Sequence, residues 1–319
     1  MARRALGRTA SFAVVLLLVS FASFVLITLL PGDPTASLLP PGSATTQQVQ
    51  ALRHELNLDR PLPVRYVQWV SRVVHGDLGR SYARDEPVAD ILWRALVVSA
   101  ELIVAVQVLA VSLGFMVGTM AAQRAGGRLD RWLQAGVSLA IAAPVFAVSM
   151  LLLLVFAVHL HWFPAVGFVH MTDGLWANVR SLVLPSVALG FPLGANYARV
   201  VRANMMTVLA GPNITLARAM GYPTRSILVR HALRQTSFNV LTLVGIQLGA
   251  LLGITVVVEQ IFALPGLGRV MIESVGRREY LVVQGGVLIV GGTFAVASLM
   301  VDVLHGLLDP RIRVVGVSR

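Results

Sequence analysis

Long uncharged stretches dominate the pattern of hydrophobic and polar positions along the chain. A helix that crosses a bilayer core of about 30 Å needs roughly 20 apolar residues. Six uncharged runs meet or approach that length, at residues 9–30, 102–123, 132–158, 181–198, 235–258 and 281–301. They predict an all-α polytopic membrane protein with six transmembrane helices. Pro144, Pro185 and Pro192 fall within two of the runs, and membrane helices tolerate proline where neighbouring groups satisfy the freed carbonyls.

The first run is long for the apolar region of a signal peptide, and no small-residue cleavage site follows it. We therefore expect a retained first helix. The runs divide the chain into residues 1–30 (tail and first helix), 31–96 (outer segment), 97–308 (helical core, with the loop 199–235) and 309–319 (tail).

The arginines predict the orientation of these helices. Residues 1–8, 124–131, 199–235 and 309–319 carry 15 Arg against two acids, Asp130 and Asp309. The alternate segments, 31–96, 159–180 and 259–280, carry 11 Arg and 11 acids. Because basic residues concentrate on the cytoplasmic side of membrane proteins, both termini and the loop 199–235 are predicted to be cytoplasmic. The pI of about 11.4 therefore reflects the membrane topology. Nucleic-acid binding is the competing explanation, but the arginines are spread over several short segments that match no recognisable nucleic-acid-binding fold.

The outer segment 31–96 is too long for a hairpin and predicts a small cap outside the membrane. Residues 44–56 have helical composition, and Tyr66 and Trp69 lie on one apolar face of a second amphipathic stretch at 61–74. The cap is either a stabilising lid or a docking surface. If it docks a partner, we expect Tyr66, Trp69 and Asp77 to take part.

Composition supports a lipid environment and excludes several chemistries. Charged residues make up 13 % of the chain, about half the roughly 25 % of soluble domains, and the mean hydropathy is +0.76. With no cysteine, the chain has no disulfide, zinc–thiolate or iron–sulfur site. All 26 basic residues are arginine, so there is no Walker A lysine for an ATPase loop and no lysine for a Schiff base.

An ordered series of short motifs carries a family resemblance. The series comprises Leu30-Pro31-Gly32-Asp33-Pro34, Leu56-Asn57-Leu58-Asp59-Arg60-Pro61-Leu62, Gly76-Asp77-Leu78-Gly79-Arg80-Ser81, Trp162-Phe163-Pro164, Ala217-Arg218-Ala219-Met220-Gly221, Arg230-His231-Ala232-Leu233-Arg234, Leu264-Pro265-Gly266-Leu267-Gly268-Arg269 and Leu308-Asp309-Pro310-Arg311. In this order and spacing the chain resembles the dipeptide/oligopeptide/nickel permease family of bacterial ABC importers, and within it the first permease subunit. The resemblance runs from about residue 8 to the C-terminus.

The resemblance implies a type I ABC importer permease fold in the bacterial inner membrane. It implies a second, homologous permease subunit to complete the pore, two cytoplasmic ATPase subunits, and an external solute-binding protein that delivers the cargo. ATP and Mg would be bound by the ATPase subunits, and this chain would carry no cofactor, no metal and no catalytic residue. Peptides are the expected cargo, while nickel, haem or another small solute could be imported by the same architecture.

The resemblance also implies that the loop 199–235 holds a short helix that sits in a groove of the ATPase. Small residues and a glycine turn suit such a helix, because Gly221 can adopt positive φ without a side-chain penalty. The residues expected to couple to the ATPase are Thr215, Ala217, Arg218, Ala219, Gly221, Arg225, His231 and Arg234. Without the resemblance, a basic loop held by anionic lipid explains the same residues.

The loop departs from the family pattern in its acids. The superfamily motif begins with a glutamate six residues before the glycine, where this chain has Thr215, and the loop contains no acid at all. An acidic contact from this end of the helix is therefore not expected here.

Two glycine stripes predict close helix packing. Gly114 and Gly118 share one face of the second run, and Gly245, Gly249 and Gly253 share one face of the fifth. The stripe of the fifth run serves either helix packing alone or a seam of the pore, where the family resemblance implies that this helix lies; in the second case Gln247 adds a polar group to the channel. Glu101 and Asp302 border the runs near helix ends, where Arg94 can serve Glu101. The outer histidines His159, His161 and His170 lack the spacing of a metal site, and we expect them at the membrane interface.

Two other classes remain, a self-sufficient secondary transporter and a membrane scaffold without transport. No inverted repeat or charged midplane site supports the first, and co-purification with ATPase chains separates both from an importer subunit.

Cysteine labelling tests the orientation, because the chain contains no cysteine of its own. A Ser43→Cys variant is expected to react with a membrane-impermeant thiol reagent in intact cells, since residue 43 lies in the outer segment. A Thr224→Cys variant is expected to react only after the cells are opened. The opposite pattern would overturn the predicted orientation.

Overall fold

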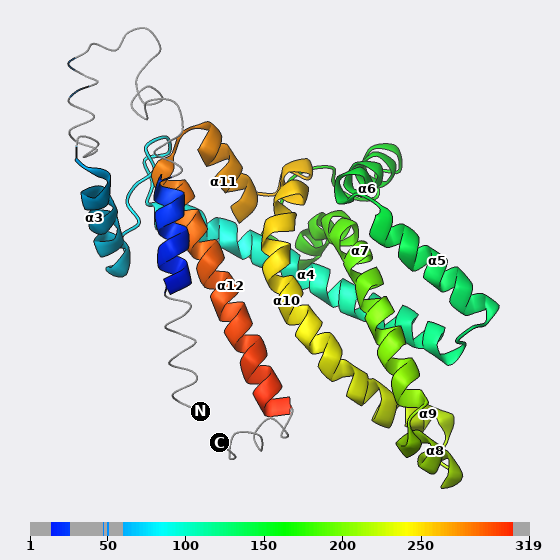
Figure 1. Ribbon diagram of the computed structural model, residues 1–319. Helices are drawn as coiled ribbons and strands as arrows, with labels where there is room; N and C mark the ends of the chain where they lie inside the picture. The colour runs from blue at the N-terminus through cyan, green and yellow to red at the C-terminus, as the bar shows by residue number, and fades with distance from the viewer. Residues whose placement is uncertain (1–13, 26–46, 48–49, 51–59, 309–319) are drawn as a thin grey trace, which may run out of the picture. The chain divides into compact units, whose positions relative to one another are not determined.

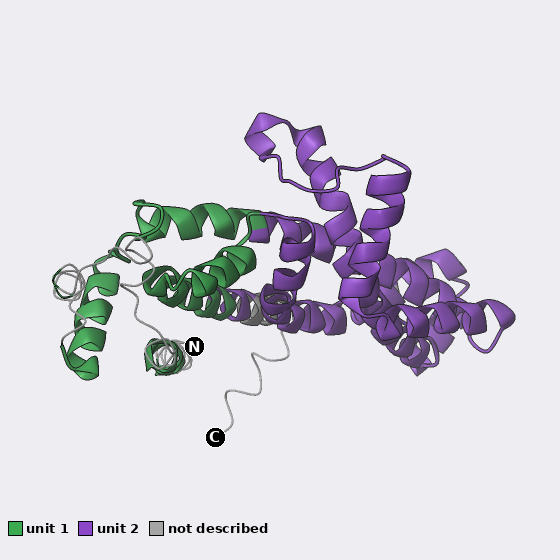
Figure 2. Ribbon diagram, turned by 90° about the horizontal axis from the view of Figure 1, so that it is seen from above, with its two compact units in different colours: residues 1–98, 265–295 green, residues 99–264, 296–319 purple. Residues whose placement is uncertain are grey.

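The computed structural model describes residues 14–25, 47, 50 and 60–308, and the described part is almost entirely helical (Figure 1). In chain order its main elements are the helix Val14–Val25, α3 (Leu62–Val74), α4 (Val88–Gln123), α5 (Arg128–Ala142), α6 (Val145–Leu152), the π-helix η2 (Leu153–His159), the short 3₁₀ helix η3 (Met171–Asp173), α7 (Leu175–Leu209), α8 (Pro212–Ala219), α9 (Thr224–Ser226), the π-helix η4 (Ile227–Leu233), α10 (Arg234–Ile261), α11 (Leu267–Gly276) and α12 (Tyr280–Leu308). The chain forms two compact units, residues 1–98 with 265–295 and residues 99–264 with 296–319 (Figure 2).

Three of the described helices are long and apolar enough to cross a membrane, judged by length and composition. They are Val88–Gln123, Thr224–Ile261 and Tyr280–Met300, which contain the second and fifth uncharged runs and most of the sixth. The helix Val14–Val25 covers the middle of the first run, whose ends lie outside the described residues. Most of residues 31–59 and the tail 309–319 also lie outside them, so the predicted boundaries of the outer segment and the tails stay predictions.

Proline interrupts the helix in the third run but not in the fourth. α5 and the following α6–η2 helix are bent by 98° at Pro144, so the third run is a broken span or a re-entrant loop rather than one straight helix. Ala143 is extended, with φ −72° and ψ 124°, because proline disfavours the helical conformation of the residue before it. By contrast α7 continues through Pro185 and Pro192. It contains the fourth run, and its crossing of the membrane remains a prediction.

In the first unit, α3 turns an aromatic face toward the helix Val14–Val25. The Tyr66 ring meets the Phe21 and Phe24 rings edge to face, with centroids 5.2 and 5.5 Å apart. The Tyr66 hydroxyl also lies 2.8 Å from that of Ser20. The amphipathic stretch predicted at 61–74 is thus a helix, and the helix Val14–Val25 covers part of its apolar face.

This packing corrects the docking prediction at Trp69. The Trp69 side chain is only 2 % exposed and lies beside Phe24 and Tyr66, so it stabilises the contact between α3 and the first helix instead of facing a partner. Asp77 lies in an exposed turn, where its carboxylate accepts the Gly79 N–H at 2.8 Å. Docking through Tyr66 and Asp77 stays a prediction.

In the second unit, α4 and α7 approach so closely that a side chain between them would clash. A Cβ placed on Gly114 would lie 2.5 Å from Cβ of Tyr197, and one on Gly118 would lie 2.6 Å from the carbonyl oxygen of Ala198. On α7, a Cβ on Gly194 would lie 3.1 Å from the α4 backbone. The predicted packing stripe of Gly114 and Gly118 is confirmed, and α7 contributes a matching stripe through Gly190 and Gly194.

Substitution at this contact is expected to destabilise the protein. Gly118→Ala should lower the free energy of unfolding in detergent by about 1–3 kcal/mol, because a backbone carbonyl cannot move aside for the new methyl group. The matched control is Gly136→Ala in α5, where a Cβ meets no described atom within 4 Å. That change should be neutral or stabilising by up to about 1 kcal/mol from helix propensity. Equal effects at both positions would contradict the close packing of α4 and α7.

Candidate functional site

The short helix α8 has clear start and stop signals in its sequence. Pro212 occupies the first turn, where its missing N–H costs nothing, and Gly211 precedes it in an extended conformation. At the other end Gly221 has φ +79°, and its N–H donates to the Arg218 carbonyl at 3.0 Å. The next N–H, of Tyr222, donates to the Ala217 carbonyl at 3.1 Å. These two bonds form a Schellman motif, which confirms the turn predicted at Gly221.

One face of α8 is held by its own chain. Ile214 and Ala217 pack with Ile227 of η4, and Val208 and Leu209 at the end of α7 cover this cluster. Ala217 is only 8 % exposed. It therefore belongs to the core of the loop, which corrects the expectation that it lies at a contact with another protein.

The opposite face of α8 and the turn after it carry exposed apolar side chains. Leu216 and Met220 are each 62 % exposed, and Tyr222 and Val229 are also exposed. Thr215, Ala219 and Arg218 lie on exposed positions of the same helix. We call the surface formed by Leu216, Met220 and Tyr222 the α8 patch. Exposed apolar side chains grouped on one short helix and its turn are typical of a protein contact surface.

The other predicted coupling residues follow α8 along the chain. Arg225 lies in α9, His231 in η4, and Arg234 begins α10; Arg225 and Arg234 are exposed. The structure thus gathers the predicted loop residues at one end of α7 and α10, around α8 and α9 (Figure 1).

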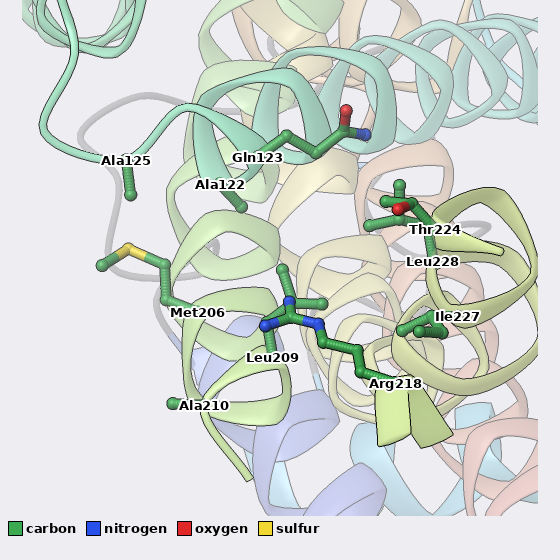
Figure 3. A pocket seen from close by; sticks show the side chains of 10 residues that line it. All are labelled: Ala122, Gln123, Ala125, Met206, Leu209, Ala210, Arg218, Thr224, Ile227 and Leu228. Atoms are coloured by element: carbon green, nitrogen blue, oxygen red, sulfur yellow. The ribbon is translucent and has the colours of Figure 1, made fainter. Parts of the chain in front are cut away.

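A cavity of about 420 Å³ lies behind α8 (Figure 3). Met206 and Leu209 of α7, Ile227 of η4 and Ala122 of α4 contribute to its apolar lining. The Arg218 side chain extends from α8 into the space toward Leu209 (Figure 3). The end of α4 therefore adjoins the loop, a neighbour that the motif pattern did not indicate.

A partly buried ion pair joins the first turn of α5 to α7 in the same region. Arg202 of α7 donates from Nε to Asp130 Oδ1 and from Nη2 to Asp130 Oδ2, both at 2.7 Å. The Gly126 N–H donates to Oδ2 at 2.9 Å. The motif comparison missed this pair, although one signal was visible: Asp130 is the one acid in the segments 124–131 and 199–235.

The predicted glycine stripe of α10 is only partly packed within this chain. Gly245 is buried and Gln247 and Gly249 are half-buried, whereas Gly253 is exposed, with no described atom within 4 Å of an added Cβ. Ile246, Ile254 and Val257 are also exposed on α10. The stripe therefore leaves part of α10 uncovered by the described residues.

Two acids of the long helices accept hydrogen bonds from neutral side chains: Glu259 lies in the last turn of α10, whereas Glu101 lies well inside α4 and not near a helix end as expected. Asn178 of α7 donates to Glu101 at 2.8 Å, and Ser99 donates to the buried Glu259 at 2.6 Å. Arg94, expected beside Glu101, pairs with Glu86 instead. The Asn178 amide thus links α7 to α4 at Glu101.

Comparison with known proteins identifies the family. Residues 114–314 match the family described as binding-protein-dependent transport system inner membrane component, and residues 1–103 match its N-terminal component. The chain belongs to this family of permease subunits, in agreement with the resemblance drawn from the motifs.

Individual relatives cover nearly the whole chain. A probable peptide ABC transporter permease protein of Sinorhizobium fredii is 34 % identical over 97 % of this chain and 98 % of its own length. A glutathione transport system permease protein of Escherichia coli is 37 % identical over 93 % of this chain and 94 % of its own length. Among solved structures, an amino acid ABC transporter with histidines has a TM-score of 0.47 and 18 % identity, over 70 % of this chain and 94 % of that chain.

The turn after α8 is expected to depend on the left-handed conformation of Gly221. Gly221→Ala should weaken the turn by about 1–2 kcal/mol, because an L-residue with a Cβ is strained at positive φ. Amide hydrogen exchange at Tyr222 should then be roughly 5- to 30-fold faster. Gly221→Asn should have a smaller effect, since asparagine visits this conformation more readily. If the Tyr222 amide exchanged at the same rate in Gly221→Ala and Gly221→Asn, the stability of the turn would not depend on the φ of residue 221.

Proposed function

We propose that this chain is a pore-forming subunit of an ATP-driven peptide importer, and that the α8 patch is its contact with an ATPase subunit. The observation that carries the coupling proposal is the two-sided character of α8. One face is locked to α7 and η4 through Ile214, Ala217 and Ile227, while Leu216 and Met220 remain exposed. A helix held in this way can transmit a push from a partner without sliding on its own scaffold.

Charge supports the same contact. Residues 199–235 contain six Arg and no acid, so their surface complements an acidic partner groove. Arg218, Arg225 and Arg234 are exposed and can steer such a partner toward α8. Because Thr215 stands where the superfamily motif has glutamate, apolar contacts and arginine would carry the interaction.

The rest of the complex follows from the family. We propose a homologous second permease subunit as the other half of the pore, with the exposed side of α10 around Gly253 and Ile254 as one place where it can pack. Two ATPase subunits that bind ATP and Mg, and an external solute-binding protein, would complete the transporter. The location would be the bacterial inner membrane, with both termini in the cytoplasm.

The peptide cargo rests on the names of the relatives. Similar chains are described as peptide and as glutathione transport permeases. We propose a peptide as the cargo; uptake of labelled di- and oligopeptides by the reconstituted complex, with glutathione and nickel as competitors, tests that choice. Uptake of nickel or of glutathione by the same complex, with no uptake of the labelled peptides, would count against a peptide cargo.

The α8 patch can be tested by a charge substitution. Leu216→Asp is expected to weaken ATPase association about 100-fold or more, because an unpaired carboxylate in the contact costs roughly 3 kcal/mol. The measurement is the amount of ATPase that co-purifies with the permease, together with binding-protein-dependent uptake. The variant should still insert into the membrane, since Leu216 packs on no core cluster described here.

Two controls belong to this test. Leu216→Met should retain ATPase association, because it keeps an apolar side chain at the contact. Thr215→Ala should be nearly silent, since its exposed hydroxyl lies 3.5 Å from the Gly211 carbonyl and makes at most a weak bond. Full ATPase binding by Leu216→Asp would refute the proposed contact, and uptake without any ATPase would favour a secondary transporter.

A further inference from the structure

The Arg202–Asp130 ion pair is a partly buried, bidentate contact between residues that are 72 positions apart in the chain. The carboxylate receives three N–H groups, two from the guanidinium and one from the Gly126 backbone. Parallel N–H···O bonds of this kind restrict both distance and orientation, which a lysine could not do. Because Asp130 lies in the first turn of α5 and also binds Gly126, the pair holds the start of α5 and the α4–α5 turn before it at one defined place on α7.

Burial indicates that position, rather than stability alone, is what the pair provides. The Asp130 side chain is 4 % exposed and that of Arg202 is 25 % exposed. Removing such ions from water costs about as much as their attraction returns, and apolar side chains of similar volume often stabilise a protein equally well. An ion pair differs from apolar packing because it accepts only one geometry.

The position of the pair connects it to α8. Arg202 lies near the end of α7, shortly before Met205, which packs in a core with Ala122 of α4 and Val201. One turn further along, Val208 and Leu209 cover the α8 cluster. A continuous series of packed residues thus runs from the α4–α5 turn, through the end of α7, to α8.

We propose that Arg202 and Asp130 are positioning residues that make the α4–α5 turn and α8 move as one body when the ATPase acts. This inference rests on the proposed function, because it assumes that α8 receives the ATPase. A displacement of α8 would then reach α4 and α5 directly, as well as α7 and α10. Without the pair, α8 could move while the turn stays behind, and ATP hydrolysis would be uncoupled from transport.

The absence of cysteine makes the movement measurable. Cysteines introduced at Ala125, in the turn, and at Asn213, in α8, can carry spin labels, since both positions are exposed. The distance between the labels is measured in the complete transporter, assembled with cysteine-free partner chains, without nucleotide and with ATP trapped. We expect one narrow distance that is the same in both states.

Neutral variants should separate the two segments. Asp130→Asn can still accept the Gly126 N–H, but it leaves Arg202 without a counter-charge; Arg202→Gln leaves the carboxylate without one. In either variant, the distribution of distances between the two labels should broaden in the ATP-trapped state. The amount of solute imported per ATP hydrolysed should fall at least tenfold. The double variant Asp130→Asn/Arg202→Gln removes both charges and allows an amide–amide hydrogen bond, so it should recover part of the coupling.

Arg199→Gln is the matched control, because it removes one arginine from an exposed position of the same helix. It should change neither the distance nor the coupling ratio. If Asp130→Asn fails to insert, Arg202→Gln and the double variant still supply the comparison. An ATP-dependent distance in the native background, or normal coupling and a narrow distance in the neutral variants, would overturn the proposal.

Failure of the proposed function is a separate result. If Leu216→Asp leaves ATPase binding intact, the contact at α8 is wrong. The nucleotide-free distance between residues 125 and 213, with and without the ion pair, still reports whether the pair joins the two segments.

Discussion

The close approach of α4 and α7 is the constraint on which the second unit depends. Glycines on both helices leave room only for backbone: Gly118 lies against the Ala198 carbonyl, and Gly194 lies against the backbone of α4. In a membrane, where lipid is as apolar as leucine, such fitting of backbone to backbone replaces the hydrophobic effect as a source of helix association. Once these helices are joined, the path of α7 as far as Leu209 is determined.

The direction of α7 in turn determines where the loop is displayed. The end of α7 provides Val208 and Leu209 as the surface on which α8 rests, and the Schellman turn at Gly221 returns the chain toward η4 and α10. The same end of α7 provides Arg202, whose guanidinium reaches Asp130 in the first turn of α5. The turn at Gly221 and the packing on α7 therefore act in the same small region. Together they hold one face of α8, and the α8 patch is the part of its surface that stays exposed.

The predictions from sequence succeeded where a residue acts through its own backbone. Gly221 ends α8 because its positive φ is a local property, and Gly114 and Gly118 pack closely because the absence of a side chain is visible in the sequence. Pro144 shows the limit of such reasoning. Proline is compatible with both a continuous membrane helix and a break, as α7 and α5–α6 demonstrate, and only the surrounding packing selects between them.

Apolar and charged runs along the chain determined, by themselves, the helical class, most of the helix positions and the family, because these depend on composition, period and motif order. Tertiary structure decided which side of each helix is covered. In α8, Ala217 packs into the core of the loop, whereas Leu216 is exposed. Trp69 packs against the first helix, and Asp130 forms an ion pair with Arg202. The periodicity of a sequence predicts which residues share a helix face, but it does not predict which other segment packs on that face. That choice belongs to residues far away in the chain, whose positions are set when the helices pack.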